Sequence, residues 1–217
     1  MPKQHPPHEP YRRSDRNEPA DPPGHDGYDD ATSHTSDLVP GNPPVPVNQW
    51  RCPAAGGGMS PTLADRMLTE FTRPGQAVHD ATGDPVVTRA VAARGRRIAS
   101  AGSRTDPPEP AILVVCGWPP DRRGLDPAIV LGALRRRLAE DGTLAIVGPT
   151  SGGFELGAAV RAATAARLAY LQHVLAVHAL IDGDRIEPAD PAWVGAGGAR
   201  HQPAHTDVLI FRQPQHA

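Results

Sequence analysis

The sequence contains almost no lysine, few aromatic residues and no marked excess of either charge. Lys3 is the only lysine among 22 basic residues, and the formal net charge is −2. A chain this close to neutral has no overall field that would draw it to nucleic acid or to a membrane surface, although a local groove can still bind DNA. Because arginine replaces lysine throughout, as codon bias in a GC-rich bacterial genome would cause, the many arginines do not by themselves indicate phosphate binding.

Paired cysteines, long apolar runs and a signal peptide are also missing. Cys52 and Cys116 stand far apart, and Cys116 lies in an apolar run typical of a small core residue, so we expect neither a disulfide nor a metal pair. No stretch approaches the roughly 20 apolar residues that cross a bilayer. Residues 1–13 lack the apolar segment of a signal peptide. These absences predict a cytoplasmic protein with no metal site and no membrane partner.

Proline and charge dominate residues 1–48, which contain eleven prolines and few aliphatic residues. Such a segment cannot bury enough apolar area to offset the entropy of ordering its backbone, so we expect a disordered tail. The tail is the element through which we would expect a protein partner to bind. Residues 49–217 then form the folded domain, with Val45–Trp50 as a short anchor onto it.

Strand and helix patterns alternate from residue 60 onward. Ser60 and Asp84 each precede a proline, which is typical of an N-cap followed by the first helical position. Strands of one type, such as Ala111–Gly117, are apolar throughout, as in sheets buried on both faces. The expected helices are 61–72, 85–94, one capped by Asp126 with Ile129, Val130, Ala133, Leu134 and Leu138 inward, and 154–166; the expected strands are 76–80, 97–101, 111–117, 143–147, 168–181 and 208–212.

This alternation predicts an α/β fold of Rossmann-like type, with a mostly parallel sheet, helices on both faces and an antiparallel pair formed by the last two strands. In such sheets ligands bind outside the carboxyl ends of the strands. That rule selects two segments, Asp80–Asp84 and Gly117–Pro120. His173 and His178 lie on an apolar strand and are expected to be core residues.

The first segment is a strand-to-helix turn that contains Asp80, Thr82, Gly83 and Asp84. Free N–H groups and the helix dipole make such a turn a cradle for a polar or anionic group, and a glycine permits close approach. Asp84 adds a negative charge, which suits a hydroxyl or ammonium group better than a phosphate. An ordinary turn with Asp84 as the helix cap explains the same residues equally well.

The second segment is the exit from the most apolar strand, through Trp118, Pro119 and Pro120. Two prolines hold the chain in a rigid extended exit, and Trp118 could stack on a planar ring such as a base. The alternative is that this segment binds no ligand and is a stiff loop with an exposed or packed tryptophan.

The order of these segments resembles the DNA amino-methyltransferases that use S-adenosylmethionine. An opening helix, Thr72-Arg73-Pro74-Gly75, a strand ending in Asp80 and a glycine turn look like that family's "TxPGDxVLDPFxGxGT" cofactor segment. The apolar strand and Pro119-Pro120 look like its Asp/Asn/Ser-Pro-Pro-Tyr/Phe motif. The likeness extends to the final His205–Phe211 strand and covers nearly all of the chain from Gln49 to Arg212.

The resemblance implies a cofactor, a site and a partner. Asp80, Thr82, Gly83 and Asp84 would contact S-adenosylmethionine, and nucleic acid would be the substrate. Trp118, Pro119 and Pro120 stand at the catalytic motif, where a polar side chain and the first proline's carbonyl accept hydrogen bonds from the target amino group.

The sequence departs from the family at four places. The cofactor turn has one glycine where the family has two or more, and Trp118, which has no acceptor, replaces Asp, Asn or Ser. Asp121 replaces the aromatic residue that would stack on a flipped base. The chain between Arg97 and Ala111 is too short for the family's usual strand and helix beside the adenine. Losing a group that binds the target amine typically lowers the rate of methyl transfer by about 10²-fold.

Three functions remain open at this point. We expect a degenerate methyltransferase-like protein, a pseudoenzyme with weak or no amino-methyl transfer and a binding or regulatory role. The alternative is an active S-adenosylmethionine-dependent methyltransferase on DNA or another substrate, with Asp121 or His79 as the base. A small α/β domain with another ligand or none is the third, and the sequence lacks a phosphate loop and a nucleophile elbow.

Overall fold

The computed structural model describes residues 37–39, 45–53, 59–102, 107–120, 124–149, 154–182, 185–187 and 205–214. Of the disordered tail predicted for residues 1–48, residues 1–36 and 40–44 lie outside the described residues, and so does Asp121. No helix among the described residues is long and apolar enough to cross a membrane.

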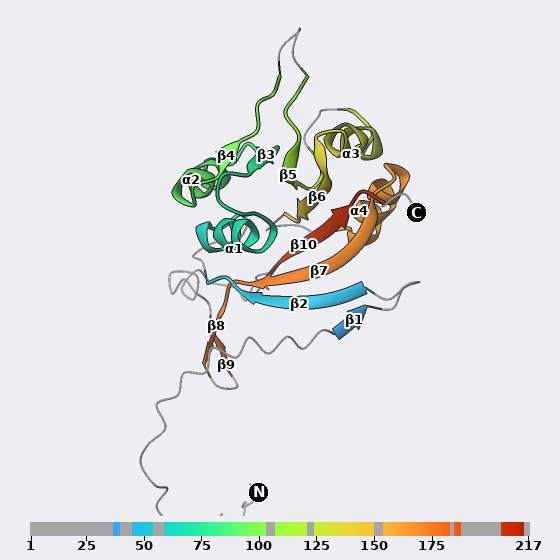
Figure 1. Ribbon diagram of the computed structural model, residues 1–217. Coiled ribbons are helices and arrows are strands. Elements are labelled where there is room, and N and C mark those ends of the chain that lie inside the picture. The colour runs from blue at the N-terminus through green and yellow to red at the C-terminus, as the bar shows by residue number, and fades with distance from the viewer. Residues whose placement is uncertain are drawn as a thin grey trace, which may run out of the picture. The chain divides into compact units, whose positions relative to one another are not determined.

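In the part of the chain that the structure describes, eight strands form one mixed sheet in the order β1-β2-β7-β10-β6-β5-β3-β4 (Figure 1). The pairs β3–β4, β3–β5, β5–β6 and β2–β7 are parallel, and β10 runs antiparallel to both of its neighbours. The predicted Rossmann-like sheet with an antiparallel closing pair is therefore confirmed. The strands are β1 Asp37–Val39, β2 Val45–Arg51, β3 Ala77–Asp80, β4 Arg97–Ile98, β5 Ala111–Gly117, β6 Leu138–Val147, β7 Ala169–Val177 and β10 His205–Arg212; β8 Leu180–Asp182 and β9 Arg185–Glu187 form a separate pair.

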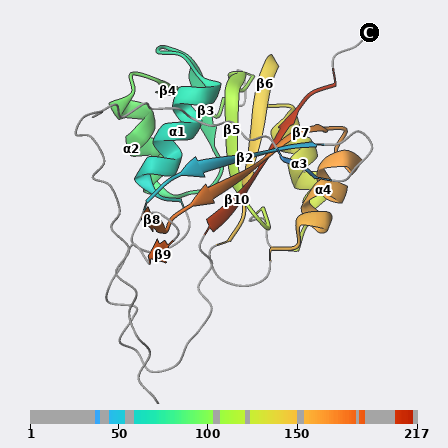
Figure 2. The ribbon, with the colours of Figure 1, turned by 90° about the horizontal axis from the view of Figure 1, so that it is seen from below.

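Two pairs of helices cover the two faces of the sheet (Figure 2). Helices α1 (Pro61–Phe71) and α2 (Pro85–Ala93) share one core with inward residues of the strands, which we call the α1–α2 core. Helices α3 (Pro127–Arg135) and α4 (Leu156–Ala165) share the other, the α3–α4 core. Helices on both faces leave the strand ends as the places where polar loops meet.

The sheet takes in residues on the N-terminal side of the predicted domain start at residue 49. Strand β2 begins at Val45 and pairs with β7, and β1 pairs with β2. Trp50 is buried in the α1–α2 core and stacks at a tilt on Phe71, with ring centroids 6.1 Å apart. The segment expected to be a short anchor is thus a full strand of the sheet.

Helix starts follow the predicted caps. The Ser60 hydroxyl accepts the Leu63 amide at 3.0 Å, and the Asp126 carboxylate accepts the Ala128 amide at 2.9 Å. Proline occupies the first turn of α1, α2 and α3, where its missing N–H costs nothing. These local signals place three of the four helices within a residue or two of their predicted starts.

Two features near α3 differ from expectation. Ile129 is 62% exposed, and Leu138 belongs to β6 rather than to the helix. The buried residues of α3 are Val130, Leu131 and Leu134, so Leu131 takes the inward position that was expected for Ile129. Strand β6 also begins before the expected start at residue 143, and it contains an irregular stretch where a side chain on Gly142 would meet the Ala111 carbonyl oxygen at 2.9 Å.

Buried histidines tie the closing strands together. His178 lies between the Cys52 carbonyl oxygen, 3.1 Å from Nδ1, and the Thr206 hydroxyl, 2.7 Å from Nε2. His173 Nε2 lies 2.8 Å from an Asp207 carboxylate oxygen. Both rings are less than a tenth exposed, so the prediction that these are core histidines is confirmed.

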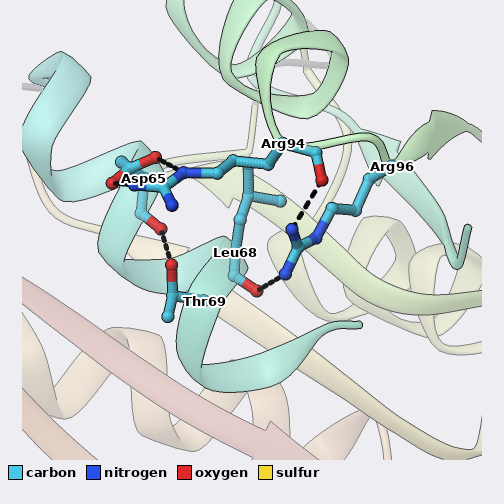
Figure 3. A network of polar contacts seen from close by, with 5 residues as sticks. All are labelled: Asp65, Leu68, Thr69, Arg94 and Arg96. Carbon is cyan, nitrogen blue, oxygen red and sulfur yellow. Dashed lines mark hydrogen bonds and ion pairs between the residues drawn. The ribbon is translucent and has the colours of Figure 1, made fainter. Parts of the chain in front are cut away.

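Arg96 caps the carboxyl end of α1 from the segment that follows α2 (Figure 3). Its guanidinium donates to the carbonyl oxygens of Leu68 and Thr72 and, at 2.9 Å, to the Thr72 hydroxyl. Arg94 forms an ion pair with Asp65 of α1 on the exposed side. Charged donors at a helix carboxyl end satisfy its last carbonyls and oppose its dipole.

Replacing Arg96 should destabilise the fold more than replacing Arg94. We expect Arg96→Met to lower the free energy of unfolding by about 2 kcal/mol, because buried acceptors lose a charged donor. The matched variant Arg94→Met removes only an exposed ion pair and should cost clearly less. Urea denaturation of both variants measures the difference, and equal losses would contradict the assigned role of Arg96.

Both cysteines are free and buried, one on each side of the sheet. Burial raises the pKa of the Cys52 thiol to about 11, against a smaller opposing effect of Arg66, and the pKa of the Cys116 thiol to about 12. The thiolate is the reactive form of cysteine, so neither thiol should react in the native state.

We therefore expect the folded protein to resist iodoacetamide at about pH 8 and to take up two labels after denaturation. Mass spectrometry of native and denatured samples counts the labels. Rapid labelling of Cys116 in the native protein would contradict its place in the α3–α4 core.

Candidate functional site

The two segments selected from the sequence meet at one edge of the sheet. Strands β3 and β5 pair in parallel with Asp80 beside Val115, and the Ala81 amide donates to the Val115 carbonyl oxygen at 2.8 Å. Strand β5 pairs in parallel with β6, and the Trp118 amide donates to the Val147 carbonyl oxygen at 2.9 Å. The loop after β3 and the exit from β5 are therefore neighbours at the carboxyl edge.

A chain of internal hydrogen bonds fills the loop after β3. One Asp80 carboxylate oxygen accepts the Thr82 amide at 2.9 Å and the Thr82 hydroxyl at 2.6 Å. The Thr82 hydroxyl accepts the Asp84 amide at 3.0 Å, and the Asp84 carboxylate accepts the Val86 amide at 2.9 Å. Three alternate amides that could face a ligand, those of Thr82, Asp84 and Val86, thus donate to side chains of the loop itself.

The other Asp80 oxygen is also occupied. It accepts the hydroxyl of Thr88, on the first turns of α2, at 3.3 Å. Gly83 has φ +70°, a backbone conformation that glycine adopts without strain, and an added Cβ would meet no atom within 4 Å. Gly83 is therefore required for the shape of the turn rather than for close approach by neighbouring protein atoms.

Sequence reasoning did not identify Thr88. Val87 and Val91 are the buried residues of α2, so the helical spacing identifies its core side but not which polar neighbour reaches back to the strand end. Thr88 could have been identified by one signal: it places a hydroxyl one turn into the helix that follows a strand ending in aspartate.

Trp118 makes packing contacts within the protein. Its half-buried ring packs against the α3–α4 core, and its peptide bond to Pro119 is cis. Pro119 is exposed, whereas Pro120 is buried. The ring predicted to stack on a ligand therefore lies partly in a core contact.

The sheet ends at β4, which has only two residues. The segment after it contains Ala99, Ser100 and Ala101, where doubly wound nucleotide-binding sheets place an acidic residue for a ribose hydroxyl. The Glu109 carboxylate contacts this segment: it accepts from Arg97 and, at 3.2 Å, from the Ser100 amide. Hydrogen bonding to Arg97 and then to the Ser100 amide lowers the pKa of Glu109, which keeps it ionised.

His79 precedes Asp80 in β3 and is half-buried. Burial lowers the pKa of His79, the charge of Arg137 lowers it further, and Asp80 opposes both. Near neutral pH the imidazole is therefore uncharged and could accept a proton. Among the described residues, no group of three or more His, Cys, Asp or Glu side chains is placed to hold a metal ion.

Comparisons with known proteins found distant structural likenesses alone. No protein-family model matches the sequence, and a search of curated proteins found no match. The chain has a distant structural similarity to SAM-dependent methyltransferases. Similar solved structures include a TehB-like SAM-dependent methyltransferase from Corynebacterium glutamicum, at 14% identity over 70% of this chain and 87% of that chain with a TM-score of 0.39. They also include a SAM-dependent O-methyltransferase from Thermotoga maritima, at 12% identity over 75% and 69% with a TM-score of 0.43. A functionally unknown protein from Deinococcus radiodurans matches at 16% identity over 84% and 94% with a TM-score of 0.36.

The lowered pKa of His79 predicts a dependence of stability on pH. The unfolded chain takes up the imidazole proton around the ordinary value of 6.5, whereas the folded chain takes it up only at lower pH. The free energy of unfolding should therefore fall as the pH drops below 6.5. His79→Gln should flatten this fall between about pH 7 and pH 5, measured by urea denaturation. A variant with the same slope as the parent would contradict a depressed pKa at this position.

Proposed function

We propose that the chain is a degenerate relative of the S-adenosylmethionine-dependent DNA amino-methyltransferases, a pseudoenzyme that has weak or no methyl-transfer activity and serves a binding or regulatory role. The observation that carries this proposal is the loop after β3, whose amides and carboxylates already bind one another.

The occupied loop supports weak cofactor binding. A ligand that needs the amides of Thr82, Asp84 or Val86 must first displace an internal acceptor. Each displaced group that remains buried without a partner costs about 1–3 kcal/mol. Asp84 also leaves a negative charge at the start of α2, where a cofactor carboxylate would be repelled.

The β5 exit supports weak catalysis. Amino-methyl transfer needs an acceptor that orients the target amine, and the indole of Trp118 offers only a donor. The neighbouring α3–α4 core also holds part of the ring. Loss of one such group typically lowers a rate by about 10²-fold or more.

The short connection after β4 supports the same conclusion. Residues that would bound an adenine ring have little room between Ile98 and Ala111. Glu109, which could reach a ribose, is instead bound to Arg97 and Ser100. A pocket without walls on this side would hold the cofactor loosely.

An active methyltransferase on DNA or another substrate is the second candidate, and His79 is the observation that favours it. An uncharged imidazole next to Asp80 in β3 can accept a proton, as a general base must. In this candidate, groups other than Trp118 must orient the substrate, because the indole of Trp118 cannot accept a hydrogen bond from the substrate's amino group.

Calorimetric titration with S-adenosylmethionine tests the proposal. We expect no saturable binding with a dissociation constant below about 1 mM, because the loop amides already donate to side chains of the loop. A labelled-methyl assay on DNA and on cell extracts should show no transfer above background.

The variant Thr82→Gly is the informative control, because it frees the Asp84 amide and returns a second glycine to the loop. Binding that is stronger in this variant than in the parent supports the blocked-loop explanation. Micromolar binding by the parent together with methyl transfer to DNA would overturn the proposal and favour the active enzyme.

A further inference from the structure

Arginines collect at one edge of the sheet, the edge at which the parallel strands begin. Arg73 follows α1 and precedes β3. Arg136 and Arg137 follow α3 and precede β6, and Arg167 follows α4 and precedes β7. Arg212 ends β10, which runs antiparallel to β6 and β7 and therefore finishes at the same edge. We call these residues the amino-edge arginines.

The amino-edge arginines follow the order of the strands, β7-β10-β6-β5-β3 (Figure 1). Arg212 is paired with Ala169 of β7 on one side and with Thr143 of β6 on the other. It therefore lies between Arg167, which leads into β7, and Arg136, which leads into β6. Neighbouring strands lie about 4.8 Å apart, so the row from β7 to β3 extends over roughly 19 Å of the edge.

These arginines are open to solvent and have few partners in the fold. All of them are exposed except Arg137, which is half-buried. None takes part in an ion pair with another described residue. Their guanidinium groups make one hydrogen bond within the part of the chain that the structure describes, from Arg137 to the Ala101 carbonyl oxygen at 3.2 Å. Arg94 and Arg97 differ, because each pairs with a carboxylate of this chain.

The helix dipole explains only part of this pattern. A cation beyond the carboxyl end of α1, α3 or α4 is favoured by the dipole, but Arg212 ends a strand. Arg96 shows what a capping arginine does in this fold, since it donates to the carbonyl oxygens of Leu68 and Thr72. The amino-edge arginines make no such bond to the helices they follow, within the described ranges. Their guanidinium groups are therefore available to another molecule.

Carboxylates do not cancel the charge of this row. The exposed carboxylates at the same edge that have no ion pair among the described residues are those of Glu70, Glu140 and Asp141. At the opposite edge, Asp80 ends β3 and Asp84 caps α2. Charge is thus separated along the strands, and the near-neutral net charge of the whole chain conceals an excess of positive charge at the amino edge.

We propose that the amino edge binds the phosphate backbone of double-stranded nucleic acid. Guanidinium groups bind phosphate oxygens through two parallel N–H groups. A duplex carries one negative charge per about 1.7 Å of its axis, so about eleven charges pass along a row of roughly 19 Å whatever the sequence.

The chemistry of the exposed side chains favours a duplex over a single strand. The exposed large hydrophobic residues among those described are aliphatic, so the bases of a single strand have no open ring on which to stack. The amino edge also lies at the other end of the strands from the loop after β3. The proposal therefore does not depend on whether that loop binds a cofactor.

Fluorescence anisotropy of the full chain with a labelled DNA duplex of mixed sequence tests the proposal. We expect binding in about 50 mM salt that weakens steeply towards about 200 mM, because bound arginines release counterions. Arg136→Glu and Arg167→Glu should each raise the dissociation constant about tenfold in about 50 mM salt. Arg136→Gln should reduce the slope of log K against log salt by about 0.9, which is the loss of one phosphate contact.

Arg89→Glu is the matched control, an equal charge reversal at an exposed arginine of α2 that has no ion pair among the described residues. It should leave the dissociation constant unchanged, and thermal unfolding verifies that each variant is folded. Absence of duplex binding in about 50 mM salt overturns the proposal. So does an equal effect of all three reversals, or none. Tighter binding to polyglutamate or to phosphatidylserine vesicles than to the duplex also overturns it, because the row would then serve an acidic protein or a membrane.

Discussion

Parallel pairing between β3 and β5 is the constraint on which the candidate site depends. It places Asp80 beside Val115 and brings the loop after β3 next to the exit from β5. A slip of one residue would turn Asp80 toward the α3–α4 side and away from Thr88 on α2, because side chains alternate along a strand. The buried, uninterrupted apolar residues of β5 hold this register, since a slip would also move its side chains out of two well-packed cores.

The two loops at this edge share one property, which is that their functional groups serve the fold. Asp80 and Asp84 accept amides and hydroxyls of their own turn, and Trp118 lies against the α3–α4 core. In a ligand site the same kinds of group are left without internal partners, because the ligand supplies them. Among the described residues of the loop after β3, the groups that could face a ligand therefore already have partners within the chain.

Much of the fold could be predicted because its signals are local. Ser60, Asp84 and Asp126 cap helices through contacts within three residues, and the apolar run of β5 identifies a doubly buried strand. The exposure of Ile129 could not be predicted, because the side of α3 that faces the sheet depends on tertiary packing rather than on spacing alone. The same holds for the site: its position followed from the strand order, whereas the bond from Thr88 to Asp80 depends on how α2 lies against β3.

Hydrogen exchange of the loop amides, followed by nuclear magnetic resonance, tests the central claim most directly. If the loop after β3 is closed by its own side chains, the amides of Thr82, Asp84 and Val86 exchange slowly without any ligand. Their chemical shifts also stay in place when S-adenosylmethionine is added. Fast exchange of these three amides that becomes slow only with S-adenosylmethionine would contradict the account, because it would show a cradle that waits for a ligand.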